Sequence, residues 1–158
     1  MDEAGVWSQI ESLYRADFGR FERVARAMAG DRDAALDAVQ EGFADALRHA
    51  GQWAGSGSLE GWVWRCVVNR ARKARQRRSA SESPTSDDPT DRTERDSDLG
   101  ARLATLPERQ RLVVFLRYFA DLEYKEIAAA LEIETGTVSA TLHAAHANLR
   151  MGYEEASV

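Results

Sequence analysis

The stretch from Leu122 to Arg150, LEYKEIAAALEIETGTVSATLHAAHANLR, decides the fold of the C-terminal part of this chain. Its apolar residues predict a short helix over Leu122–Leu131, a tight connection over Glu132–Gly136 and a longer helix that ends at about Arg150. This spacing is typical of a helix-turn-helix, whose second helix reads DNA. Periodicity alone also fits an ordinary helical hairpin in a small bundle, so the DNA-binding interpretation needs support from elsewhere in the chain.

The longer of these two helices has one apolar stripe and several polar faces. The stripe is expected to be buried and comprises Val138, Leu142, Ala145 and Leu149. Hydroxyl and imidazole groups on the other faces could reach base edges or phosphates. These candidate DNA contacts are Thr137, Ser139, Thr141, His143 and His146. The two histidines lie three residues apart, but no third ligand accompanies them, so we expect no metal site.

Three helices are predicted in the N-terminal part of the chain, because apolar residues recur there at spacings of three and four in three segments. Gly30 ends the first helix, and Asp31 or Asp33 caps the second. A Gly/Ser-rich loop over residues 51–57 follows, and the third helix starts at Ser58. The third helix is expected to pack through Leu59, Trp62, Val63, Cys66 and Val67.

Residues 79–98 separate these helices from the C-terminal ones and are rich in Ser, Asp, Thr and Pro. With almost no apolar side chain, such a segment cannot offset the entropy lost on ordering. We therefore predict an all-α chain of two small helical modules, residues 1–78 and 99–158, joined by a flexible acidic linker. Fully extended, these twenty residues reach roughly 65 Å, nearly two turns of DNA.

Composition narrows the class of protein. The net charge of -5 over 158 residues excludes a uniformly basic coat for nucleic acid, although a local basic patch is compatible with it. Cys66 is the only cysteine, so no internal disulfide forms, and without a Cys/His cluster we expect no metal or cofactor. The N-terminal residues lack a signal-peptide pattern, and no stretch is long and apolar enough for a membrane span. We expect a cytoplasmic protein without membrane association.

A basic ridge follows the apolar part of the third helix, with no acidic residue between Trp64 and Ala80. It consists of Arg65, Arg70, Arg72, Lys73, Arg75, Arg77 and Arg78. Such a ridge binds nucleic acid by neutralising phosphates, and nearby aromatic rings such as Trp53 and Trp64 suit unstacked bases. The alternative is that Trp62 lies in the core and the basic run is a solvated helix end, and we assign Trp62 and Cys66 to core packing.

An acidic row lies on the second helix, where Asp33, Asp37, Glu41 and Asp45 recur every four residues. Like charges at this spacing repel by about a few tenths of a kcal/mol per pair, so the row does not stabilise the helix. It fits either a surface for a basic protein partner or an ordinary solvated face. No histidine, serine or metal constellation surrounds the carboxylates, so we expect no catalysis and no enzyme.

Two groups of residues together resemble a known family. In the N-terminal module they are Asp37, Val39, Gln40, Glu41, Phe43, Trp62, Arg65 and Asn69, which resemble the second conserved region of bacterial sigma factors. In the C-terminal module they are Leu106–Arg111, Leu116–Phe119, Glu126–Ala128 and Gly136–Val138, which resemble the family's fourth region. Because only a linker separates these regions, the chain resembles the compact extracytoplasmic-function (ECF) subgroup.

The resemblance implies a transcription initiation factor that binds core RNA polymerase and directs it to promoters. Contacts with the polymerase clamp helices are implied for Asp37, Gln40, Glu41 and Phe43, and the fourth region is expected to meet the polymerase flap. Capture of the melted minus-ten element is implied for Trp53, Ser56, Trp64, Arg65, Asn69, Arg70, Arg72, Lys73 and Arg77. Contacts with the minus-thirty-five element are implied for Arg117, Lys125, Thr137, Ser139, Thr141, His143 and Arg150. An anti-sigma protein is a further candidate partner.

Two other classes of function fit parts of the sequence. A stand-alone helix-turn-helix regulator would explain the C-terminal module but has no use for Asp37, Gln40 and Glu41. A helical adaptor that binds only protein would leave the basic ridge unexplained. The chain also departs from the family, because Lys73 replaces an acid common in relatives, and Arg150 is the only Arg or Lys between Gly136 and Tyr153.

We predict that the isolated protein binds duplex promoter DNA poorly, because its recognition helix has few cations with which to attract phosphates. Selective binding is expected to require core polymerase. An electrophoretic mobility shift at moderate salt, with and without polymerase, measures this difference. Tight and sequence-selective binding by the free protein would contradict the prediction.

Overall fold

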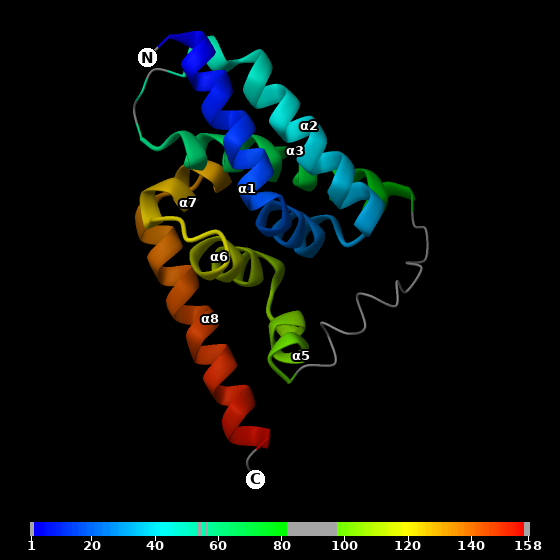
Figure 1. Ribbon diagram of the computed structural model, residues 1–158. Helices are drawn as coiled ribbons and strands as arrows, with labels where there is room; N and C mark the ends of the chain where they lie inside the picture. Colours follow the sequence, from blue (N-terminus) through cyan, green and yellow to red (C-terminus); the bar gives the residue numbers. More distant parts are fainter. Residues whose placement is uncertain (1, 54, 56, 82–97, 157–158) are drawn as a thin grey trace.

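The computed structural model describes residues 2–53, 55, 57–81 and 98–156, and all regular structure in these ranges is helical (Figure 1). This confirms the predicted all-α fold class. The N-terminal helices are α1 (Glu3–Ala29), α2 (Arg32–Arg48), the short 3-10 helix η1 (Ala50–Gln52) and α3 (Leu59–Ser81). The C-terminal helices are α5 (Asp98–Thr105), α6 (Glu108–Tyr118), α7 (Tyr124–Leu131) and α8 (Thr135–Ala156).

Local hydrogen bonds start and end the N-terminal helices where short polar residues and a glycine allow it. Asp31, rather than Asp33, caps α2, because its carboxylate accepts a hydrogen bond from the Ala34 amide at 3.1 Å. Ser58 caps α3 in the same way, accepting from the Gly61 amide at 2.9 Å. Gly30 ends α1 in the left-handed conformation (φ 77°), as the sequence predicts, because glycine adopts this conformation without strain.

An aromatic cluster forms the core of the N-terminal module. Trp64 stacks on Phe21 with ring centroids 3.8 Å apart, and Phe43 meets Phe21 edge-on at 4.8 Å. The backbones of α2 and α3 approach closely beside this cluster, since a Cβ at Gly42 would lie 2.6 Å from the Cα atom of Val67. Only glycine fits at this crossing.

The C-terminal module contains the predicted helix-turn-helix. Glu126 accepts a hydrogen bond from the Glu123 amide at 2.8 Å and so closes a capping box at the start of α7. The turn is made by Glu132 in the left-handed conformation (φ 56°), whereas Gly136, which we placed in the connection, lies within α8. The predicted stripe is correct, because Val138, Leu142 and Ala145 are buried and Leu149 packs against the core.

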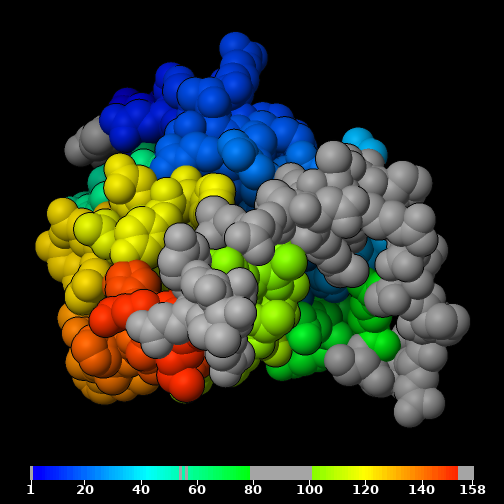
Figure 2. Space-filling model, turned by 90° about the horizontal axis from the view of Figure 1, so that it is seen from below, coloured from blue at the N-terminus to red at the C-terminus, as the bar shows by residue number. Residues whose placement is uncertain are grey.

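The two sets of helices lie against each other, with α3 on α7 and α1 on α6 (Figure 1 and Figure 2). Their buried side chains form one continuous hydrophobic cluster. At the predicted linker, α3 continues to Ser81 and α5 begins at Asp98. The rest of the predicted linker, residues 82–97, lies outside the described residues, so its expected flexibility remains a prediction.

Replacement of Gly42 by alanine should lower the free energy of unfolding by about 1–3 kcal/mol, because the added methyl group forces α2 and α3 apart. Urea unfolding followed by circular dichroism measures the change. Gly19→Ala in α1 is the matched control, since its Cβ would meet nothing within 4 Å, and it should stabilise the helix slightly. Equal stability of the two variants would show that the α2–α3 crossing tolerates a side chain.

Candidate nucleic-acid interface

The acidic row of α2 lies at the surface, where a protein partner can reach it. Asp37, Gln40 and Glu41 are exposed, which fits their predicted role in polymerase binding. Phe43 does not fit that prediction, because it is only 4% exposed and packs edge-on against Tyr14 and Phe21. Phe43 is therefore placed to pack in the core beneath α2 rather than to contact a partner protein.

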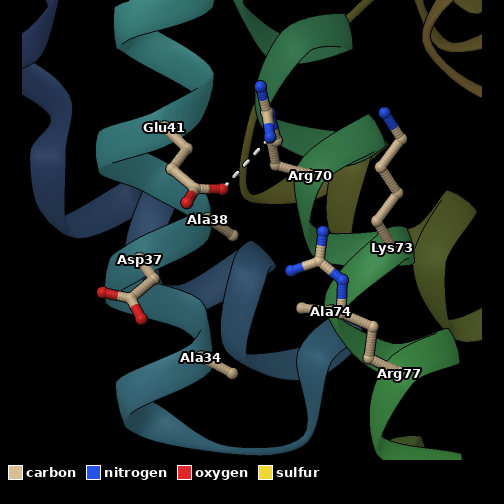
Figure 3. Close-up of a pocket in the computed structure, with 8 residues that line it drawn as sticks. All are labelled: Ala34, Asp37, Ala38, Glu41, Arg70, Lys73, Ala74 and Arg77. Carbon is tan, nitrogen blue, oxygen red and sulfur yellow. Dashed lines mark hydrogen bonds and ion pairs between the residues drawn. The ribbon is translucent and has the colours of Figure 1, made fainter. Parts of the chain in front are cut away.

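The acidic row and the basic ridge face each other across a groove of about 210 Å³ between α2 and α3 (Figure 3). Its α2 wall is formed by Ala34, Asp37, Ala38 and Glu41, and its α3 wall by Arg70, Lys73, Ala74 and Arg77. Glu41 reaches across to Arg70 at 3.3 Å, whereas the Asp37 carboxylate turns away from α3 (Figure 3). Asp37 therefore faces the outside of the module.

Arg70 also makes the strongest polar contact between α2 and α3. Its Nε and Nη2 atoms donate to the two carboxylate oxygens of Asp45 at 2.6 and 2.9 Å. These hydrogen bonds are the main reason that the pKa of Asp45 falls from 3.8 to about 2, against the opposing effect of burial, and Arg48 adds to the lowering. With its guanidinium occupied in this way, Arg70 has a structural role, which our prediction of a DNA contact did not foresee.

Other cations of the ridge are free to meet phosphates. Lys73 and Arg77 are exposed, Arg72 is half-buried, and none of the three forms an ion pair with another described residue. Arg75, by contrast, pairs with Glu108 of the C-terminal module at 3.2 Å. The free cations thus lie on one part of α3, next to the groove.

The predicted aromatic contacts divide into one that fits and one that does not. Trp53 is half-buried at the end of η1 and packs against the core, with part of its ring exposed. Trp64 is fully buried in its stack on Phe21, so our prediction that it meets unstacked bases is wrong for this structure. The sequence around it, WVWRCVV over residues 62–68, is apolar on most faces of the helix. Periodicity therefore could not separate Trp64 from the half-buried Trp62, which we had assigned to the core.

Two other predicted minus-ten residues lie near these elements. Asn69 is half-buried on α3 and Arg65 is exposed, with its guanidinium 3.3 Å from Glu132 of the C-terminal module. Ser56 lies outside the described residues. The loop around it contains Gly55 and Gly57, both with positive φ, a conformation that glycine allows.

Two of the predicted minus-thirty-five residues are used within the module. Arg117 donates to the carbonyl of Leu122 at 3.2 Å and lies over the Tyr124 ring, so it braces the turn before α7. The hydroxyl of Thr141 donates to the carbonyl of Thr137 at 2.7 Å, one helical turn earlier. Neither group points freely towards a partner.

The remaining residues of α8 define a free face. Ser139, His143 and Arg150 are exposed, as is Lys125 on α7, while Thr137 is half-buried. Ala140 is also exposed on this face, one position after Ser139, and the sequence pattern did not single it out because alanine has no polar group. A methyl group on the DNA-reading face of a helix can contact the methyl group of thymine. An alanine at an exposed position of that face could therefore have been predicted as a DNA contact.

No set of His, Cys, Asp and Glu side chains that could hold a metal ion occurs among the described residues. His146 is engaged by the hydroxyl of Tyr118 at 2.8 Å.

Among the residues that the structure describes, no helix is long and apolar enough to cross a bilayer.

A helix-turn-helix module packed on a three-helix module with adjoining acidic and basic surfaces defines a two-module nucleic-acid-binding protein. Family models match both parts: Sigma-70 region 2 over residues 13–81 and Sigma-70, region 4, over residues 97–149. The RNA polymerase sigma-E factor of Streptomyces avermitilis is 33% identical over 152 residues, which cover 90% of this chain and 83% of the relative. The chain therefore belongs to the sigma-70 family of RNA polymerase sigma factors, in its ECF subgroup.

A second relative and two solved structures are also similar to this chain. The ECF RNA polymerase sigma factor SigE of Mycolicibacterium smegmatis is 31% identical over 163 residues, and the match covers 94% of this chain but only 63% of that relative. The structure of CnrH in complex with the cytosolic domain of CnrY shares the fold, with a TM-score of 0.73 at 20% identity over 97% of this chain and 95% of that one. The sigma factor RpoE of Bartonella quintana, in complex with the anti-sigma factor NepR, gives 0.71 at 17% identity over 90% and 95%.

Replacement of Asp45 by asparagine should lower the free energy of unfolding at pH 7 by about 2 kcal/mol, because the folded-state pKa of about 2 lies below the ordinary 3.8. A depressed pKa contributes stability above about pH 4 that is lost as the pH falls towards 2. Urea unfolding at a series of pH values should therefore show a flatter acid dependence in D45N. D33N, at an exposed position of the same helix, is the control, and a D45N profile as steep as that of D33N would refute the assignment.

Proposed function

We propose that this chain is a dissociable subunit of RNA polymerase that directs the enzyme to specific promoters and helps to melt them. The observation that carries the proposal is the groove of the region 2 module, where exposed carboxylates of α2 adjoin unpaired cations of α3. One surface suits a protein partner and the other suits DNA, and a separate helix-turn-helix supplies a second DNA contact. In this proposal the chain acts in the cytoplasm and has no catalytic activity of its own.

The polymerase contact is assigned to Asp37, Gln40 and Glu41 on α2. Asp37 points outward and is not held by a cation of α3, so it is available to a basic partner surface such as the clamp helices. Glu41 is already paired with Arg70, and a partner would have to compete for it. Phe43 supports this surface from the core instead of touching the polymerase.

The minus-ten contact is assigned to α3 and the loop before it. Arg65, Arg72, Lys73 and Arg77 would neutralise phosphates of the displaced strand, and counterion release would make this binding depend on salt. Trp53 at the edge of the loop would stack on an unpaired base.

The minus-thirty-five contact is assigned to the free face of α8. Ser139 and His143 carry hydrogen-bonding groups, Ala140 offers a methyl group, and Lys125 and Arg150 would bind phosphates on either side. The opposite face of the module would meet the polymerase flap. Reading by short side chains requires the helix to lie deep in the major groove, which the small residues of α8 permit.

An anti-sigma protein is a further partner in this proposal. The RpoE structure to which the chain is similar in fold holds the anti-sigma factor NepR. A regulator of that kind would control how much of the chain reaches polymerase.

Run-off transcription from a supercoiled genomic library, with purified core polymerase in the presence and absence of this protein, tests the proposal. New start sites are expected only when both are present. The double variant D37K/E41K should abolish them by weakening polymerase binding at least tenfold, since like charges now meet across the interface. E11K on α1, which lies outside the acidic row, is the charge-reversal control and should retain them.

Start sites that appear equally with D37K/E41K would show that α2 is not the docking face. Selective footprints on duplex DNA without polymerase, together with no polymerase binding, would favour a stand-alone regulator instead.

A further inference from the structure

The free face of α8 offers only short side chains in the central turns of the helix. Over residues 138–145 the exposed side chains are those of Ser139, Ala140 and His143. Thr141, between them, is half-buried and donates its hydroxyl to the helix backbone. Neither Ser139 nor His143 has a hydrogen-bond partner among the described residues. What this part of α8 presents to DNA is therefore a hydroxyl, a methyl and an imidazole group.

No long cation stands beside these three groups. Arg150, the only Arg or Lys between Gly136 and Tyr153, follows Ala140 at about 15 Å along the helix axis. Successive base pairs are roughly 3.4 Å apart, so Arg150 lies several base pairs away from Ala140 when α8 follows the groove. Arginine or lysine on guanine is the commonest specific contact in the major groove. The centre of α8 lacks the residue for that contact.

The charge near the start of α8 is acidic. Glu132 and Glu134 are exposed there, and carboxylates repel phosphates. Between Tyr118 and Arg150 the sequence contains one Lys or Arg, Lys125 on α7. The first helix of a helix-turn-helix crosses the DNA backbone, so Lys125 suits a phosphate and not a base. Discrimination between sequences therefore depends on the three short groups of α8.

Gly136 lets the start of α8 lie close to DNA. It is exposed, it has no positive φ, and a Cβ there would meet nothing within 4 Å. The fold itself therefore does not require glycine at this position, although glycine lowers helix stability relative to alanine. Ala140 lies one turn further along the same face of the helix. Close approach at Gly136 brings the methyl group of Ala140 within reach of base edges.

Thymine carries one group that an alanine side chain can recognise. Its C5 methyl group is the apolar group that base pairs present in the major groove, where the other bases present hydrogen-bonding groups. Contact between two methyl groups removes apolar surface from water and needs no hydrogen-bond geometry. An exposed Ala140 at a base edge therefore favours thymine over adenine, guanine and cytosine.

We propose that Ala140 selects a thymine in the minus-thirty-five element through its methyl group, so that this chain recognises a T·A pair where an arginine or lysine would select guanine. Ser139 and His143 lie on either side of Ala140 and donate hydrogen bonds to neighbouring bases. This inference rests on the proposed contact of α8 with the minus-thirty-five element and names the base that the contact prefers.

Thymine analogues test the proposal with holoenzyme assembled from core polymerase and the full chain. The DNA is a promoter revealed by run-off transcription, and footprinting locates its upstream contact. Each thymine in that footprint is replaced in turn by deoxyuridine, which removes only the C5 methyl group. One replacement should weaken holoenzyme binding, measured by fluorescence anisotropy, about three- to fivefold, because one methyl group loses its apolar contact.

The variant A140G removes the methyl group from the protein instead of from the DNA. Its holoenzyme should bind the thymine and uracil promoters with equal affinity, because the contact is already lost. A16G is the matched control, since it removes a methyl group from an exposed alanine of α1 and should retain the wild-type difference. Circular dichroism checks the helix content of both variants. The ratio of the two affinities reports on the contact even where a variant is less stable.

A second measurement returns the methyl group on a different base. The sensitive thymine is replaced by cytosine or by 5-methylcytosine, which carries its methyl group at the same ring position. Wild-type holoenzyme should bind the methylated DNA about threefold more tightly than the cytosine DNA, whereas A140G should bind the two equally. Equal binding of both DNAs by wild type would contradict the methyl contact.

The variant A140R tests whether residue 140 faces a base edge at all. Arginine is a good helix former, so the variant tests the position even if A140G unfolds. Its holoenzyme should favour a G·C pair over T·A at or next to the sensitive position by about tenfold, since arginine donates two hydrogen bonds to guanine. An unchanged base preference in A140R would overturn the proposal.

The remaining outcomes separate this inference from the proposed function. A footprint without thymine, or equal affinity of wild type for every uracil promoter, would overturn the role of Ala140. A uracil effect that persists in A140G would do the same. If the chain yields no new start sites with core polymerase, the proposed function fails instead, and that result is obtained before any thymine is replaced.

Discussion

Burial of Trp64 against Phe21 is the contact on which the other features depend, because it fixes how α3 is rotated about its axis. The face of α3 that carries Trp64 must point into the N-terminal module, and Gly42 allows α2 to approach that face closely. The basic residues then lie beside the acidic row of α2, and the N-terminal end of α3 lies against α7. If α3 were rotated differently about its axis, its cations would no longer line the groove and its contact with α7 would be lost.

The cations of α3 that border the groove differ in burial and in pairing. Arg70 has a side chain that is 26% exposed, and it is neutralised by Asp45 and Glu41. Lys73 and Arg77 lie further out, where unpaired charge costs little because water solvates it. The same sequence run therefore contains residues that hold the module together and residues that are left to bind phosphate.

Much of this arrangement could be predicted from the sequence. Helical periodicity located the helices, and Gly30 and the stripe of Val138, Leu142 and Ala145 behaved as predicted. Trp64, Phe43 and Arg70 were misjudged for a common reason: their partners lie on other helices, and a single-helix pattern contains no information about tertiary contacts. The left-handed turn at Glu132 was missed as well, because the nearby glycine offered a more usual residue for that conformation.

The contact between the modules could not be predicted from sequence patterns, since it depends on how side chains from separate helices are placed in three dimensions. A tight interface would compete with polymerase and DNA, because any partner that binds the separated state must supply the free energy of opening. The ion pair of Arg65 with Glu132 is largely exposed and contributes little, whereas the buried apolar side chains of both modules form one cluster. Separating the modules would therefore expose part of this apolar cluster to water, at a free-energy cost that rises with the area exposed.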